Sequence, residues 1–168
     1  MQSKFFVYLL ISTIACFIWQ KESLAVDAEA LAKKVLCRTC LAKIYVSQRK
    51  IPEATAQYTE LLKLTPGDAA IHFEFASLLA HNDKPDLAAV QYKAAAKLKP
   101  NVAEYQAGLG YALMCSKNYE EAVAAYSKAC NLGGKYQTQL QNAQQYQAQQ
   151  KLLDQYKAKL QTKEQNDD

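Results

Sequence analysis

The sequence predicts an all-α protein, an α-solenoid of three stacked helix–turn–helix repeats followed by a long C-terminal capping helix. The first observation is a period of 34 residues, at which alanine and tyrosine both recur. The second is that apolar residues follow helical stripes around these positions. A period of this length in helical sequence indicates repeats that bury their apolar faces against one another. The recurring residues are Ala54, Ala88 and Ala122, and Tyr58, Tyr92 and Tyr126.

The first 25 residues differ from the rest and are typical of a secretory signal peptide. Residues 5–19 are apolar apart from Ser12 and Thr13, and small residues follow at Ser23 and Ala25. This order predicts cleavage before Val26. We therefore expect an exported protein, periplasmic or secreted, whose mature chain begins at Val26.

Two alternatives to cleavage stay open. The first is an uncleaved membrane anchor, although the apolar run over residues 5–19 is shorter than the ~20 residues of a spanning helix. The second is a lipoprotein with its lipid on Cys16, although Thr13 stands where such motifs prefer an aliphatic residue. Either alternative would hold the protein to a membrane by its N-terminus.

The first helix pair is expected over residues 27–63. Asp27 is suited to cap a helix that runs to Gln48, because its side chain can accept from the first backbone N–H groups. Pro52 then lies in the first turn of the second helix, where its missing N–H costs nothing. Pro66 ends that helix, and Asp68 is placed to cap the next one.

The next two pairs repeat this pattern of helices and turns. Helices are expected over residues 69–80 and 86–98. The third pair flanks a turn at residues 116–118 and ends at Gly133-Gly134 in place of a proline. The three pairs together form the predicted repeat domain, residues 26–135.

Residues 136–168 form a separate, glutamine-rich segment. Low complexity of this kind can indicate disorder, but its apolar residues keep helical spacing and no Pro or Gly interrupts them. We expect one helix from Tyr136 to about Leu160, whose first half covers the open end of the third pair, as a repeat stack requires. The charged residues from Thr162 are expected to fray. Self-association through this helix is an open alternative role.

The repeats resemble the tetratricopeptide repeat family, whose pattern is Trp-x-x-Leu-Gly-x-x-Tyr, then Ala-x-x-x-Phe, then Pro. They are assigned to residues 35–68, 69–102 and 103–135. The resemblance implies a right-handed solenoid. The signature places hold Leu41, Tyr45, Ala54, Tyr58 and Pro66 in the first repeat, Phe75, Leu79, Ala88, Tyr92 and Pro100 in the second, and Leu109, Gly110, Leu113, Ala122 and Tyr126 in the third.

One departure from the family pattern is at the tryptophan position, which holds Arg38, His72 and Gln106. The other is Gly134, which stands where the last repeat would have its proline. All the signature residues are interpreted as core residues: alanine lets the helices of a pair approach closely, and tyrosine fills the space between one pair and the next.

Cys37 and Cys40 form the one candidate motif for chemistry. A redox pair of this spacing works at a helix N-terminus, where the helix dipole lowers a thiol pKa. Here the two cysteines lie inside a predicted helix and lack a βαβ context, which favours small residues on a helix face. A thiol-disulfide redox protein that uses Cys37 and Cys40 is kept as the alternative function, and thiol titration against a redox buffer separates the two.

Charge and histidine spacing argue against several other classes of protein. The chain has 20 basic and 16 acidic residues, interspersed, for a net charge of +4, and it shows no basic stripe of the kind nucleic acid requires. His72 and His81 are nine residues apart, not the four of a paired metal site. We therefore expect no catalysis, cofactor, metal site or nucleic-acid partner.

The resemblance implies a concave face lined by the first helix of each repeat. Family members that hold the carboxyl terminus of heat-shock chaperones use Lys, Arg and Asn on this face, and only Lys43 could serve here. An apolar peptide or helix fits the remaining residues better. The other inward positions are Leu36, Thr39, Val46, Ser47, Ala70, Ala80, His81, Glu104, Ala107, Cys115, Tyr136, Gln139 and Ala143. The predicted groove residues are Lys43, Phe73, Ser77, Tyr111, Met114 and Tyr146.

The function predicted from these observations is a non-catalytic, exported interaction module, acting as an adaptor, scaffold or assembly factor. It would hold a peptide or helix of a protein partner in the apolar groove, and would touch a membrane only through residues 1–25 if these are retained. The alternative for every groove residue is that it packs against neighbouring helices instead.

Overall fold

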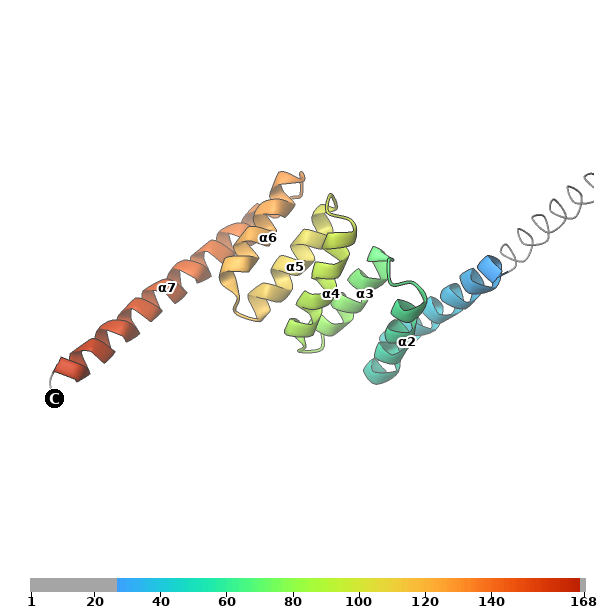
Figure 1. The fold of residues 1–168 in the computed structure, drawn as a ribbon, viewed down its shortest axis with the longest axis horizontal. Coiled ribbons are helices and arrows are strands. Elements are labelled where there is room, and N and C mark those ends of the chain that lie inside the picture. Colours follow the sequence, from blue (N-terminus) through green and yellow to red (C-terminus); the bar gives the residue numbers. More distant parts are fainter. Residues whose placement is uncertain (1–26, 167–168) are drawn as a thin grey trace, which may run out of the picture. The chain divides into compact units, whose positions relative to one another are not determined.

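The computed structural model describes residues 27–166, with side chains to residue 161. All regular structure in this range is α-helical, as predicted (Figure 1). The predicted signal peptide and the lipid site at Cys16 lie outside the described residues. The chain divides between Leu64 and Thr65 into two compact units. No helix in the described part is long and apolar enough to cross a membrane.

The first unit holds one helix pair, a helix over residues 27–47 and α2, Ile51–Leu64. Arg49 in the turn between them adopts a left-handed backbone with φ 57°, and the Lys50 N–H donates to the Tyr45 carbonyl at 2.9 Å. A cross-helix hydrogen bond joins the pair, because the Arg38 Nη1 donates to the Gln57 Oε1 at 3.0 Å.

The second unit is a row of five helices, each of which packs against the next (Figure 1). These are α3 (Ala69–Ala80), α4 (Pro85–Leu98), α5 (Ala103–Cys115), α6 (Tyr119–Asn131) and α7 (Gln137–Asn166). The predicted cap at Asp68 is confirmed, since its side chain accepts from the backbone N–H groups of Ala70 at 2.9 Å and Ile71 at 3.4 Å.

The 34-residue period of the sequence is also a period of the backbone. The left-handed turn residues are Arg49, Asp83 and Lys117, with φ of 57°, 55° and 62°. After each of them the next N–H donates back to a carbonyl of the preceding helix, as at Asn118 to Leu113, 2.8 Å. This is the bond that closes a Schellman turn, and it satisfies carbonyls left unpaired at a helix end.

The recurring alanines and tyrosines are buried, as predicted. Ala54, Ala88 and Ala122 are all inaccessible to solvent, and the three tyrosines are at most 4% exposed. Tyr92 of α4 reaches the next pair, where it lies against Gly108 of α5. The tyrosines therefore fill space that the small residues leave, and that packing fixes the spacing of successive helices.

The first half of α7 covers the end of the third pair, as predicted. Leu140 and Ala143 belong to one core cluster with residues of α5 and α6. Beyond Tyr146 no described residue of α7 is buried, and the helix extends past α6 (Figure 1). Leu152, Leu153, Tyr156 and Leu160 all lie exposed on this second half.

Several expected helix limits differ from those of the structure: the first helix ends at residue 47 rather than at Gln48, and α7 begins at Gln137 rather than at Tyr136. Helix α4 begins at Pro85 rather than Asp86, because the fixed φ of proline suits the first helical position. Helix α7 continues to Asn166, so the predicted fraying from Thr162 does not hold up to that residue. Glutamine, lysine and glutamate are good helix formers, and no Pro or Gly ends the helix.

Candidate functional site

Two adjoining pockets lie on one face of the second unit. Pocket A has a volume of about 330 Å³ and pocket B of about 270 Å³, and both are open to solvent. They share three wall residues, Tyr111, Tyr126 and Gln139, so they form one divided groove. Pocket A is completed by Met114, Cys115, Tyr119, Asn142 and Tyr146, and pocket B by Phe73, Tyr92, Glu104, Ala107, Gly108 and Tyr136.

The walls come from helical spacing on α5 and α7. On α5, Tyr111, Met114 and Cys115 are three and four residues apart and so share one face. On α7, Asn142 and Tyr146 repeat this arrangement. The groove therefore lies between the exposed face of α5 and the first half of α7.

Aromatic contacts hold the rings of the groove in place. In pocket A the Tyr146 ring stacks on Tyr119 of α6, with centroids 5.6 Å apart and planes inclined by 18°. In pocket B the Phe73 ring meets Tyr92 edge-on at 5.3 Å and Tyr105 at 5.0 Å. Ring pairs at such distances add attraction beyond the burial of area. The walls are consequently ordered by contacts within the protein.

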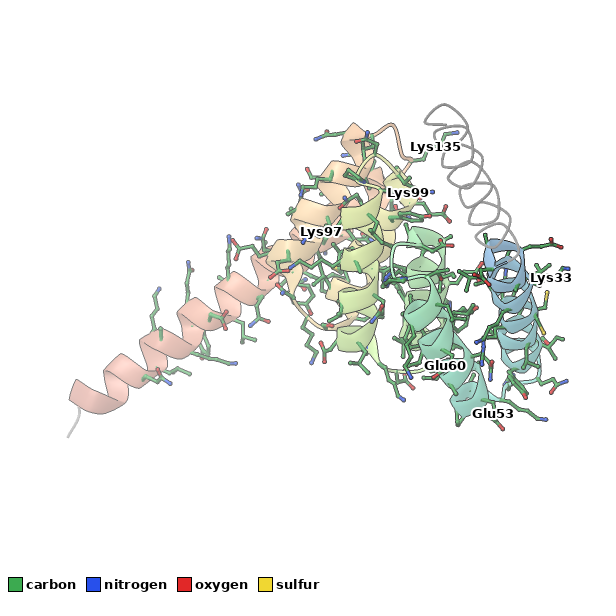
Figure 2. All side chains as sticks on the ribbon, turned by 45° about the vertical axis from the view of Figure 1, so that its right-hand side comes forward. Lys33, Glu53, Glu60, Lys97, Lys99 and Lys135 are labelled. Atoms are coloured by element: carbon green, nitrogen blue, oxygen red, sulfur yellow. The ribbon has the colours of Figure 1, made fainter. Side chains whose placement is uncertain are left out.

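The groove is almost without charge. Among its described wall residues, Glu104 in pocket B is the one charged side chain. Lys97, Lys99 and Lys135, which are labelled in Figure 2, line neither pocket. Burial raises the pKa of Tyr126 to about 12, with smaller contributions from Cys115 and Tyr111. Interaction with Cys115 likewise raises the pKa of Tyr111, so both hydroxyls keep their protons at neutral pH.

Four of the six predicted groove residues line the pockets. Tyr111 lies in both, Met114 and Tyr146 in pocket A and Phe73 in pocket B. Tyr111 and Tyr146 are 44% and 48% exposed, which makes their rings available to a ligand.

The other two predicted residues lie apart from the pocket walls. Ser77 is half-buried and lies near the Tyr92 hydroxyl, where it partly offsets the burial that raises the pKa of Tyr92, so it neighbours a wall residue rather than forming the wall. Lys43 is exposed on the helix over residues 27–47, in the first unit.

Sequence reasoning missed five wall residues, among them Gly108, which lines pocket B where the Tyr92 ring lies against it. Tyr92 and Tyr126 were interpreted as core, and they are buried, yet each also exposes part of its ring to a pocket. Asn142 lies three residues after Gln139 and four before Tyr146, so helical spacing could have identified it. Tyr119 begins α6, and only the packing of α7 brings it to the groove.

The candidate redox motif lies outside these pockets. Cys37 and Cys40 are both exposed on the helix over residues 27–47 and are free thiols. Within the described residues, no group of three or more His, Cys, Asp or Glu side chains is placed to hold a metal ion. The redox role stays a prediction.

Solved structures with a similar fold come from tetratricopeptide repeat proteins. The first such repeat domain of Spaghetti (RPAP3), bound to the HSP90 peptide SRMEEVD, has a TM-score of 0.64 and 22% identity, over 69% of this chain and 94% of that one. The Sgt2 domain from Aspergillus fumigatus has a TM-score of 0.61 and 18% identity, over 67% and 78% of the two chains. The TPR2B domain of yeast Sti1, in a complex with pHsp70, has a TM-score of 0.60 and 22% identity, over 70% and 98%.

A search of curated protein sequences gives no significant match. The sequence profile of the tetratricopeptide repeat matches residues 41–101 and 77–137. These two segments overlap and together cover more than half of the chain. With the repeated turns, buried alanines and helix order described above, they show that the chain belongs to the tetratricopeptide repeat family.

Proposed function

We propose that this protein is a non-catalytic interaction module that holds a peptide or helix of a partner protein in the groove of pockets A and B. The observation that carries the proposal is the row of partly exposed aromatic rings, Tyr111, Tyr146 and Phe73, in a hollow without basic side chains. Aromatic side chains in a pocket often contribute most of the binding energy of an interface. Support comes from the related structures that were solved with a bound peptide or chaperone.

The ligand we propose differs from the HSP90 peptide SRMEEVD, which is acidic. Three of the seven residues of that peptide carry a carboxylate. The described walls of the groove offer no Lys or Arg to pair with them, and Glu104 would repel them. We propose a ligand that is apolar and not acidic.

Export is part of the proposal. Residues 1–25 have the order of charged, apolar and small residues that signal peptides show. N-terminal sequencing of the protein from an envelope or secreted fraction tests this, with Val26 as the expected first residue. An intact Met1 would indicate an anchor, and a blocked, lipid-bearing Cys16 would indicate a lipoprotein.

A peptide selection tests the binding function. A display library of random peptides is selected on the full chain, and each enriched peptide is then measured against two variants. Tyr111→Ser should lower affinity by about tenfold or more, which corresponds to the loss of one aromatic anchor. Tyr156→Ser is the matched control, because Tyr156 is 61% exposed on α7 and lines neither pocket.

Phe73 is a poor choice for this test. Its ring packs on Tyr92 and Tyr105 and so joins three helices, and Phe73→Ser would disturb the fold together with the pocket. Circular dichroism on each variant confirms that helix content is kept. Peptides that bind wild type and Tyr111→Ser equally would place the binding surface outside the groove.

A further inference from the structure

We infer that the groove binds a proline-rich segment in the polyproline II conformation, with a basic residue at the end that reaches pocket B. The inference rests on the proposed function and names the class of its ligand. It depends on three properties of the groove: its division into two small pockets, its tyrosine walls, and the position of its single carboxylate.

The division of the groove into two pockets favours an extended ligand with regularly spaced ridges. Pockets A and B, of about 330 and 270 Å³, adjoin at Tyr111, Tyr126 and Gln139. A polyproline II chain repeats every three residues, or about 9 Å, so residues one turn apart lie on the same side and can enter successive pockets.

The shared wall of the groove matches such ridges. Tyr111 and Tyr126 stand between the two pockets and line both. Aromatic-lined grooves are the recurrent receptors of Pro-rich segments, since a rigid ring packs on flat aromatic surfaces and the preformed helix loses little entropy on binding. The stacked Tyr119 and Tyr146 offer a further flat surface in pocket A.

The polar groups of the walls match the ligand as well. A proline-rich backbone has few N–H groups and keeps its carbonyls unpaired, so it presents mainly acceptors. The side chains of Tyr111, Gln139 and Asn142 each carry N–H or O–H donors, and all three are exposed on the groove. An α-helix would offer these donors no free backbone carbonyl along its length, because its own N–H groups already donate to those carbonyls.

The charge of the groove gives the ligand a direction. Glu104 lines pocket B and not pocket A, and no other charged residue is among the described wall residues. A Lys or Arg next to the proline that enters pocket B would complement this carboxylate, and an acidic residue there would be repelled. The orientation of the bound segment follows from this single side chain.

The experiment uses the full chain and three synthetic peptides. The first has repeated Pro-Pro-Leu units with Arg at one end. The second replaces every proline by alanine, which keeps leucine and arginine but favours an α-helix. The third replaces arginine by glutamate. Affinity is measured by fluorescence anisotropy of a labelled peptide, and the proline peptide should bind about tenfold or more tighter than both others.

A second readout locates the bound peptide. Cys115 is an exposed thiol in the wall of pocket A, and Cys37 is an exposed thiol in the first unit. Alkylation followed by mass spectrometry should show Cys115 protected by the proline peptide and Cys37 unchanged. The variant Glu104→Gln should abolish the difference between the arginine and glutamate peptides, while Tyr156→Ser should leave it as in wild type.

The outcomes separate the inference from the function on which it rests. If the alanine peptide binds as tightly and protects Cys115, the proline preference is overturned and the interaction function stands. If neither peptide protects Cys115, the inference is overturned, and the peptides selected from the random library decide whether the groove binds any ligand. Protection of Cys115 by the proline peptide alone supports both.

Discussion

Gly110 of α5 lies directly against the ring of Tyr126 of α6: a Cβ atom at Gly110 would be 2.9 Å from Cδ2 of that ring. Tyr126 is only 4% exposed and belongs to the core cluster of α5, α6 and α7. The ring therefore has little room to move aside. The absence of a side chain at position 110 is what lets these two helices of the third pair approach each other.

We expect Gly110→Ala to destabilise the protein, although alanine is the better helix former. The gain in helix propensity is about 1 kcal/mol, whereas overpacking a core typically costs 1–3 kcal/mol. The net loss should be about 1 kcal/mol in urea unfolding followed by circular dichroism. Gly67→Ala is the control, since no atom lies within 4 Å of the added Cβ, and it should leave stability unchanged or raise it by up to about 1 kcal/mol because alanine has less freedom in the unfolded chain. A Gly110→Ala protein more stable than wild type would contradict this contact.

The sequence predicted this packing because the repeat imposes it three times. Ala54, Ala88 and Ala122 are buried at the positions that the 34-residue period predicts. The same register predicts five inward positions on α5, and all five line the pockets. Small and large residues recur at a fixed period because each repeat needs the same packing, so the sequence alone predicts that packing.

Sequence patterns did not predict the contacts that depend on the conformation of particular side chains. The tryptophan position of the family holds Arg38 and His72 here, and each bonds a glutamine of the partner helix: Arg38 to Gln57 at 3.0 Å, and His72 Nδ1 to Gln91 Oε1 at 2.8 Å. Both pairs are separated by 19 residues. A cross-helix hydrogen bond thus joins the helix pair at this position in the first two repeats, and no composition rule predicts it.

The left-handed turn at Lys117 gives a second prediction. A non-glycine residue with φ near 60° costs roughly 1–2 kcal/mol relative to a right-handed conformation, and glycine avoids this cost. Part of the gain is lost to the greater freedom of glycine in the unfolded chain. Lys117→Gly should therefore raise the free energy of unfolding by about 0.5–1 kcal/mol.

Lys128→Gly is the matched control for the turn. Lys128 is an exposed lysine within α6, so the same substitution should lower stability by about 1 kcal/mol there. Opposite signs for the two lysines would attribute the effect to the backbone conformation. Equal signs would count against the left-handed turn.

Alkaline pH should destabilise the protein through Tyr126. Burial raises the pKa of this hydroxyl from 10.0 to about 12 in the folded state. The folded state therefore holds its proton more tightly than the unfolded state. The resulting stability is fully present below pH 10 and is lost as the pH rises toward 12, with a loss of roughly 1.4 kcal/mol at pH 11.

Tyr126→Phe tests this dependence, because phenylalanine keeps the ring and has no proton to lose. Urea unfolding at pH 8 and pH 11 should show a smaller loss of stability for the variant than for wild type. Tyr92 keeps part of the alkaline sensitivity in both proteins, since burial raises its pKa as well. An identical loss in the two proteins would exclude Tyr126 as its source.

The two halves of α7 should contribute differently to the protein. The first half carries Leu140 and Ala143, which are buried in the core cluster of the third pair. Burying a leucine side chain is worth about 1.5–3 kcal/mol, so a chain that ends at Lys135 should lose at least about 2 kcal/mol of stability. A chain that ends at Gln149 keeps every buried residue of α7 and the whole of pocket A, and its melting temperature should equal that of the full chain.

The same shorter chain tests the proposed self-association of α7. Leu153, Tyr156 and Leu160 are exposed at helical spacing on the second half, where no described part of the second unit covers them. If these residues hold two copies together, light scattering should give the full chain a larger mass than the chain that ends at Gln149, which should be monomeric. Tyr156→Glu in the full chain should also give a monomer, because each copy would have to bury an unpaired carboxylate at the contact. Equal masses for the full and shortened chains would leave α7 with its capping role alone.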